Sequence, residues 1–201
     1  MTTTTFTDLI TDESQLRDVF GWPSERSLNK QIERLDQHCR AIIAKSPFLL
    51  LGTSDTTGRC DVSPKGDYPG FVRVLDEKTI AIPDLPGNNR LDTLTNMLNN
   101  PQVGLLFMIP GMNETLRVNG RARLRTDLEP KLAIVVEVTE VYLHCAKALI
   151  RSAFWSAPPP GEAMPAGSRR AVRRRRCMRA IAAMRSTNPA SGARDQLCFR
   201  R

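Results

Sequence analysis

The sequence lacks the motifs by which several large enzyme classes bind or attack their substrates. It contains no G-x-G-x-x-G fingerprint, no P-loop and no G-x-S-x-G elbow, which argues against a Rossmann dehydrogenase, a P-loop nucleotidase and an α/β-hydrolase. No apolar run approaches the roughly 18 residues that a membrane span needs. The opening MTTTTFTDLITDE has neither the basic nor the apolar region of a secretory signal. We therefore expect a cytoplasmic protein with no membrane partner.

Cysteine is sparse and has no framework spacing. The five cysteines are odd in number and include no C-x-x-C pair, so reduced thiols are expected rather than disulfides. His38-Cys39 and His144-Cys145 supply the residue types of a zinc site, but adjacent residues point in different directions and neither pair has ligand spacing. The sequence predicts no metal site.

The acidic and basic residues are unevenly distributed. Residues 1–155 hold 18 Lys and Arg against 19 Asp and Glu, a net charge of −1. Residues 156–201 hold 11 Arg, no Lys and 2 acids, a net charge of +9. The whole basic excess of the chain (net +8) therefore lies in its last 46 residues and says nothing about the body.

Three interpretations of this Arg- and Pro-rich tail stay open. Its five prolines and few large apolar residues are typical of a disordered basic tail. Its composition is also what GC-rich codons give in a shifted reading frame, which would make the terminus unnatural. In the third interpretation the tail is a patch that binds nucleic acid or a membrane, although residues 169–185 contain no aromatic residue for base stacking.

The body of the chain reads as a mainly β protein. Apolar or alternating runs separated by turn residues predict antiparallel strands, with a hairpin turn at 55–58 and another at 76–78. The predicted strands are 48–53, 60–63, 71–75, 79–83, 103–109, 115–125 and 132–144. No strand–helix–strand alternation occurs, so an antiparallel barrel or sandwich is expected.

Helices are predicted at three places around these strands. Leu28, Ile32, Leu35, Cys39, Ile42 and Ile43 recur at helical spacing, which predicts one amphipathic helix in an N-terminal helical extension, residues 1–45. Residues 89–99 predict a second helix whose apolar face is Leu91, Leu94 and Leu98. Residues 146–155 predict a short closing helix, after which the tail begins.

Two loops carry residues suited to an anionic ligand. In 86–91, Gly87 gives backbone freedom, Asn88 and Asn89 offer amide donors, and Arg90 offers a planar fork for phosphate. An ordinary strand-to-helix turn with a solvated Arg accounts for the same residues.

The second loop runs from 63 to 67. It contains Ser63, Lys65, Gly66 and Asp67, where Lys65 could meet a phosphate or a ring carbonyl and Asp67 could accept a hydrogen bond; a plain surface turn is the alternative. Arg73, at mid-strand, is a weaker candidate.

A third group surrounds the closing helix. Lys147 and Arg151 are four residues apart and share a helix face, and Trp155 could form the wall of a pocket. His144 is the one histidine of the barrel region, so it is the candidate proton donor near neutral pH. The alternative is a capping helix with solvated cations and a core Trp.

Several ordered segments resemble the pyridoxamine-phosphate-oxidase-like family of FMN-binding split β-barrels. They are SPKGD at 63–67, PGNNRLD at 86–92, NPQVGLLF at 100–107, LRVNGRARL at 116–124 and HCAKAL at 144–149. The resemblance covers residues 46–155 and implies a split-barrel domain with flanking helices that forms a homodimer. It also implies one FMN in each of two interface clefts, with basic phosphate ligands from 86–91 and with 144–151 near the flavin.

The resemblance implies an FMN-dependent oxidoreductase that passes hydride or electrons through flavin N5 to or from an unknown small molecule, with a nicotinamide as a candidate donor. The substrate-phosphate signature of true pyridoxamine phosphate oxidases is missing near the C-terminus, which argues against vitamin B6 oxidation. Two alternatives stay open. One is a non-catalytic flavin or haem carrier on the same barrel, and the other is nucleic-acid binding through the tail.

Overall fold

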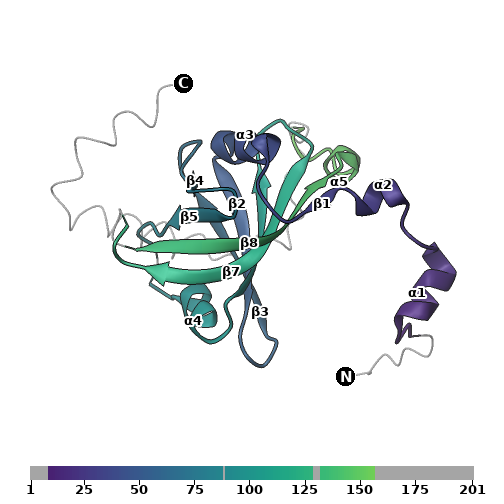
Figure 1. Cartoon of the computed structure of the whole chain (residues 1–201), viewed down its shortest axis with the longest axis horizontal. Helices are drawn as coiled ribbons and strands as arrows, with labels where there is room; N and C mark the ends of the chain where they lie inside the picture. Colours follow the sequence, from purple (N-terminus) through teal and green to yellow (C-terminus); the bar gives the residue numbers. More distant parts are fainter. Residues whose placement is uncertain (1–8, 88, 129–131, 157–201) are drawn as a thin grey trace, which may run out of the picture. The chain divides into compact units, whose positions relative to one another are not determined.

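Eight antiparallel strands and five short helices make up the described part of the chain. The computed structural model describes residues 9–87, 89–128 and 132–156. The elements are α1 (Glu13–Phe20), α2 (Glu25–Leu28), β1 (Gln31–Ile32), α3 (Gln37–Lys45), β2 (Phe48–Ser54), β3 (Cys60–Gly66), β4 (Arg73–Val74), β5 (Thr79–Pro83), α4 (Asp92–Asn99), β6 (Gln102–Met108), β7 (Thr115–Arg125), β8 (Ala133–His144) and α5 (Lys147–Arg151). The prediction of a mainly β, antiparallel fold with flanking helices is confirmed (Figure 1).

All eight strands belong to one sheet. Its order is β3-β2-β6-β7-β8-β5-β4, and β1 pairs with β8 beside β5. The long strands β7 and β8 form its centre, while β3 and β4 are its two edges. No helix among the described residues is both long and apolar enough to cross a membrane.

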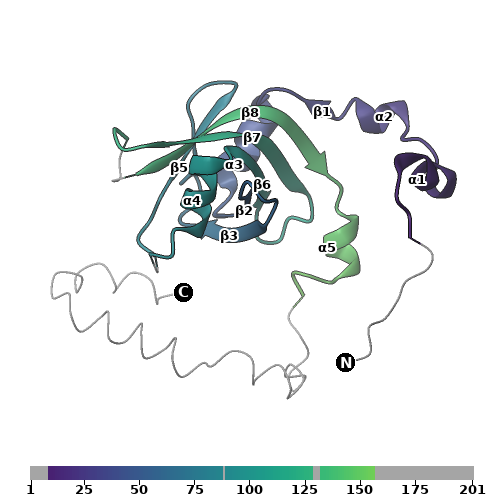
Figure 2. The same ribbon diagram turned by 90° about the horizontal axis from the view of Figure 1, so that it is seen from below.

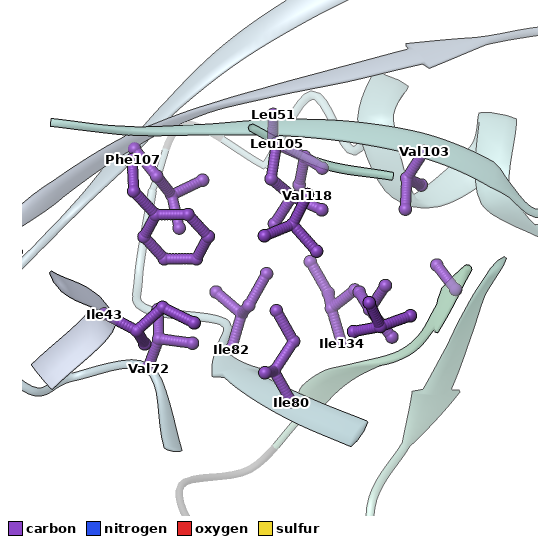
Figure 3. Packing of buried hydrophobic residues seen from close by; sticks show 14 of the residues in the cluster. Ile43, Leu51, Val72, Ile80, Ile82, Val103, Leu105, Phe107, Val118 and Ile134 are labelled. Atoms are coloured by element: carbon purple, nitrogen blue, oxygen red, sulfur yellow. The ribbon is translucent and has the colours of Figure 1, made fainter. Parts of the chain in front are cut away.

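The sheet curves around one apolar core. Alternation along β2 buries Leu49 and Leu51 completely, and the same period on β6 buries Leu105 and Phe107. In Figure 3 the labelled side chains of β2 and β6 point toward those of β5 and β8 on the opposite side of the core. Each such buried side chain contributes roughly 1.5–3 kcal/mol of hydrophobic stabilisation.

The hairpin turn predicted at 55–58 is confirmed. The Asp55 carboxylate accepts hydrogen bonds from the backbone N–H groups of Thr57 (2.8 Å) and Arg59 (3.0 Å). Gly58 has a φ of 85°, which a residue without Cβ adopts at no steric cost. The turn sets the register of β2 against β3 along all seven residues of each.

The single N-terminal helix predicted from residue 28 onward is wrong. Gln31 and Ile32 pair with β8, and the backbone N–H of Leu35 donates to the Glu77 carbonyl at 2.7 Å, which keeps this segment extended. The helix begins only after Asp36, whose carboxylate caps it. The helical spacing was misleading because Leu35 and the apolar residues of α3 pack in the same core. Leu35 reaches this core from an extended segment, and the α3 residues reach it from a helix.

The apolar face predicted for the second helix is also partly wrong. Leu94 is buried as expected, but Leu91 and Leu98 are exposed and Met97 is buried instead. The helix begins three residues later than predicted, at Asp92. Its buried face therefore includes the polar Asn96, whose amide donates to Thr53 Oγ1 at 3.1 Å.

A β-bulge interrupts the pairing of β7 with β8. Asn119 pairs with Glu140 and Gly120 with Val138, so Thr139 is an extra residue on β8. A Cβ on Gly120 would lie 2.2 Å from the backbone oxygen of Glu137, which no repacking of side chains can relieve.

We expect Gly120→Ala to lower the free energy of unfolding by about 3 kcal/mol, because backbone must move to admit the methyl group. For a chain of this size the melting temperature should fall by about 6–12 °C. Gly52→Ala is the matched control, since its Cβ would meet Gly104 oxygen at an ordinary 3.5 Å. Thermal unfolding followed by circular dichroism measures both. Equal melting temperatures for the two variants would contradict the steric argument.

Candidate functional site

A cavity of about 820 Å³ opens beside the edge strand β3. It is enclosed by β3, by the loop from β5 to α4, by the first turn of α4, and by Thr126 and Leu132 at either end of the β7–β8 connection. Its volume lies in the range of cofactor sites. In Figure 2, α4 and the loop before it lie next to β3 on this side of the sheet.

The structure brings most of the first two predicted groups together in this cavity. Ser63, Lys65, Asn89 and Arg90 all line it. Asn88 lies outside the described residues. The prediction that 63–67 is a loop is wrong, because Ser63 to Gly66 pair with β2 as the end of β3.

Gly66 and Asp67 do not line the cavity. Gly66 packs close to Pro47, whose carbonyl would lie 3.1 Å from an added Cβ. Asp67 instead lines a separate cleft of about 330 Å³, together with Arg73, Phe71 and Leu85. Leu85 lines both spaces, so they are neighbours.

The start of α4 presents backbone donors to the cavity. Its N-cap residue is Leu91, which has no side-chain acceptor, so no side chain caps the first N–H groups of the helix. Asn89 and Leu91 have φ values of 58° and 61°, in the left-handed region that is unusual for residues with a Cβ. Backbone N–H groups at such a helix start form a ready site for an anion.

Both candidate cations of the cavity already have a carboxylate partner. Arg90 Nε donates to Asp92 Oδ2 at 2.8 Å, and Lys65 Nζ lies 3.2 Å from Asp84 Oδ1. The Arg90 and Asp92 side chains are 70% and 46% exposed, so solvent screens that pair. The Lys65 and Asp84 side chains are only 19% and 22% exposed, so solvent screens this ion pair less. The pair joins β3 to the β5–α4 loop.

The acids of the cavity were missed by sequence reasoning. Asp61 accepts from the Asn96 amide at 3.0 Å, and Asp84 directly follows β5. Asp84 lies beside Lys65, whereas Asp92 is paired with Arg90 and the charge of Asp61 also raises the pKa of Arg90, so carboxylates lie at both ends of the cavity. An acid immediately after a strand, opposite a lysine on another, was the available signal for Asp84.

The third predicted group lies at the other end of β8. Leu132, just before β8, lines the cavity, whereas His144 ends this 12-residue strand and α5 follows it with Lys147 and Arg151. Figures 1 and 2 both show α4 and α5 well apart. Trp155 Nε1 donates to the Met112 carbonyl at 2.9 Å. Within one chain these residues do not join the cavity.

His144 belongs to a polar cluster on the outer face of β7 and β8. Its ring lies edge-on to Tyr142 at 5.1 Å, and the Arg117 guanidinium lies 5.2 Å from the Tyr142 ring and is ion-paired with Glu140. Burial, and then the charge of Arg117, lower the pKa of His144 below its usual 6.5. A neutral imidazole at pH 7 is a poorer proton donor than the sequence suggested.

Three of the five cysteines lie in the described part of the chain, and none of these three forms a disulfide. Cys39, Cys60 and Cys145 are free thiols, and burial raises the pKa of Cys39 to about 11, which keeps it inert. Among the described residues, no three His, Cys, Asp or Glu side chains lie together as metal ligands would.

The structure is thus an antiparallel barrel with a cofactor-sized cavity between its edge strand and the start of a helix. Comparison with known protein families identifies the family. The profile described as pyridoxamine 5'-phosphate oxidase matches residues 35–162, and the chain belongs to that family. The match begins at Leu35, the first residue of the buried core. No curated protein matches the chain.

Three solved structures that are similar to this chain share only 14–17% sequence identity with it. A putative pyridoxamine 5'-phosphate oxidase from Lactobacillus delbrueckii is 17% identical over 55% of this chain and 99% of its own, with a TM-score of 0.44. An FAD-binding protein from Mesorhizobium loti is 14% identical over 57% and 97% (TM-score 0.41). The haem storage protein HutZ from Vibrio cholerae is 17% identical over 55% and 94% (TM-score 0.38).

We expect Arg117→Met to raise the pKa of His144 toward 6.5, because it removes a nearby positive charge and leaves Glu140 without its partner. Titration of the His144 ring protons by NMR measures this. Arg121→Met, on the same strand, is the control and should leave the pKa unchanged.

The same shift sets a pH dependence of stability. Because the folded-state pKa is lowered, the unfolded chain binds more protons, so the contribution of His144 is present above pH 6.5 and is lost as the pH falls through the folded pKa. If the His144 pKa stays unchanged or falls in Arg117→Met, the charge of Arg117 is not a cause of the lowered pKa.

Proposed function

We propose that this chain is an FMN-binding flavoprotein whose cofactor lies in the cavity between β3 and the start of α4. The observation that carries the proposal is the uncapped, cavity-facing start of α4, next to Arg90. The family membership supports it independently. FMN, not FAD, is favoured because the loop is compact and the sequence has no fingerprint for an adenine dinucleotide.

The residues present fit the phosphate end of FMN. The Asn89 amide, the guanidinium of Arg90 and the first N–H groups of α4 are all donors. In the free protein the Asp92 carboxylate is paired with the Arg90 guanidinium. A phosphate with up to two negative charges can replace Asp92 in this exposed ion pair. Lys65 is held in the less exposed pair with Asp84, whereas the Arg90–Asp92 pair is open to exchange, so we place the phosphate end at α4 and the ring end toward Lys65.

The chemistry of the bound flavin would be hydride or electron transfer at N5. Lys65 and Ser63 would then orient the polar edge of the ring, where the ammonium offsets negative charge that develops on reduction. Asp84 holds the Lys65 ammonium in place through their 3.2 Å contact. This role requires no nucleophile or paired carboxylates from the protein.

The proposal includes a homodimer. The outer faces of β2 and β6 carry Phe48, Leu50, Leu106 and Met108, all only half-buried in one chain, and Val62 on β3 is 67% exposed. Such an apolar sheet face is typical of a protein interface. A second copy seated there would supply the His144, Lys147, Arg151 and Trp155 group that one chain keeps away from its own cavity.

The identity of the cofactor is tested by acid release from the purified protein followed by chromatography. We expect one FMN per chain, and light scattering of the same sample should give the mass of two chains. Stoichiometric FAD, or no flavin retained at saturating FMN, would refute the proposal. Loss of flavin absorbance on anaerobic addition of NADH or NADPH, which supplies the hydride, would then separate an oxidoreductase from a carrier.

We expect Arg90→Ala to weaken FMN binding by about tenfold or more, because a charge-assisted contact with the phosphate is lost. Riboflavin, which lacks the phosphate, should bind wild type and variant equally. Fluorescence quenching of each flavin measures both affinities, with Arg59→Ala, on the β2–β3 turn, as a control outside the cavity. An equal loss for riboflavin and FMN would show that Arg90 does not hold the phosphate.

A further inference from the structure

A second cleft, of about 490 Å³, lies on the outer side of the β7–β8 hairpin. It shares no lining residue with the cavity between β3 and the start of α4, the proposed flavin cavity. The lining comes from β7, β8 and the turn between β4 and β5, and it contains four cations and three carboxylates. We call it the arginine cleft.

Three of the cations form a row along β7. Arg121, Arg123 and Arg125 are exposed, whereas Ala122 between them is buried, so the arginines share the outer face. Residues two apart on a strand are spaced by about 6.6–6.8 Å, and the long side chains of neighbours can converge on one group. Only arginine, never lysine, occurs in this row.

Two charges of the cleft have an oppositely charged neighbour, and a third is held by a backbone hydrogen bond. Arg125 Nε donates to Asp127 at 2.7 Å. Glu77 lies 3.6 Å from Arg34, and Asp76 accepts from the Lys78 backbone N–H at 2.7 Å. Arg125 and Glu77 are thus each paired with an opposite charge, whereas Asp76 keeps its negative charge.

The remaining charges favour an anion. Within the described part of the chain, the side chains of Arg121, Arg123 and Lys78 have no hydrogen bond or ion pair. Glu137, opposite Arg121 in the β7–β8 register, is the one acid that is likewise unengaged. Three cations without an ion-pair partner therefore face two carboxylates, Asp76 and Glu137, which leaves an excess of positive charge.

We propose that the arginine cleft binds a small phosphate monoester, held between the guanidinium groups of Arg121 and Arg123. A guanidinium presents a planar fork that matches phosphate oxygens, and a dianion needs two such partners. Glu137 would accept hydrogen bonds from hydroxyl groups of the same ligand, which favours a phosphorylated sugar or polyol. The volume is that of a small-molecule site, which argues against a phosphorylated protein segment.

Isothermal titration of the full-length protein with glucose 6-phosphate tests the proposal, with glucose as the uncharged probe. We expect saturable binding of the phosphate ester alone, weakened by added salt. Arg121→Gln and Arg123→Gln should each weaken it about tenfold. Arg59→Gln, an exposed arginine outside the cleft, should have no effect, and melting temperatures confirm that each variant is folded.

Two further variants distinguish binding in the arginine cleft from binding in the flavin cavity. Glu137→Gln should tighten the binding of inorganic phosphate, since it removes a like charge from the cleft. Arg90→Ala should leave glucose 6-phosphate binding unchanged. Loss of binding in Arg90→Ala, equal loss in Arg59→Gln, or no saturable binding at millimolar ligand would each overturn the proposal. Tighter binding of a phosphoserine peptide than of glucose 6-phosphate would overturn it as well.

Discussion

Strand β8 is the constraint on which the remaining structure depends. It pairs with β7 on one side and with β5 and β1 on the other, so it holds both the barrel and the N-terminal segment in register. Leu132, just before it, lines the cavity beside β3, and the last residue of β8, His144, lies at the far end. Its twelve residues therefore set how far apart the two groups of candidate residues must be within one chain.

This separation gives the proposed dimer a physical role. A single chain brings together phosphate donors, Lys65 and three carboxylates, but no aromatic side chain among the described residues lines its cavity. Trp155 and the α5 cations Lys147 and Arg151 are the candidate residues that lie away from this cavity within one chain. Two copies related by a two-fold axis would bring each half of the site against the other half of the partner copy.

Strand positions were predictable from the sequence because they depend on a local period. The turn at Asp55 and the span of β7 follow from turn residues and alternation alone. The failures at Leu35 and Ser63 share a cause, since long-range backbone hydrogen bonds keep both residues extended where the local sequence favours a helix or a loop. The start of α4 could not be read from PGNNRLD, because a left-handed Leu91 contradicts its own local preference.

The acids beside Lys65 and Arg90 have a consequence for the energetics of cofactor uptake. Because Asp92 already partners Arg90, binding of a phosphate there exchanges one ion pair for another instead of creating a new one. Added salt weakens the outgoing pair as well as the incoming one. The flavin affinity should therefore depend on ionic strength less steeply than the number of cations in the cavity suggests. The same exchange sets free a carboxylate at the mouth of the cavity, whose negative charge would repel a second anion.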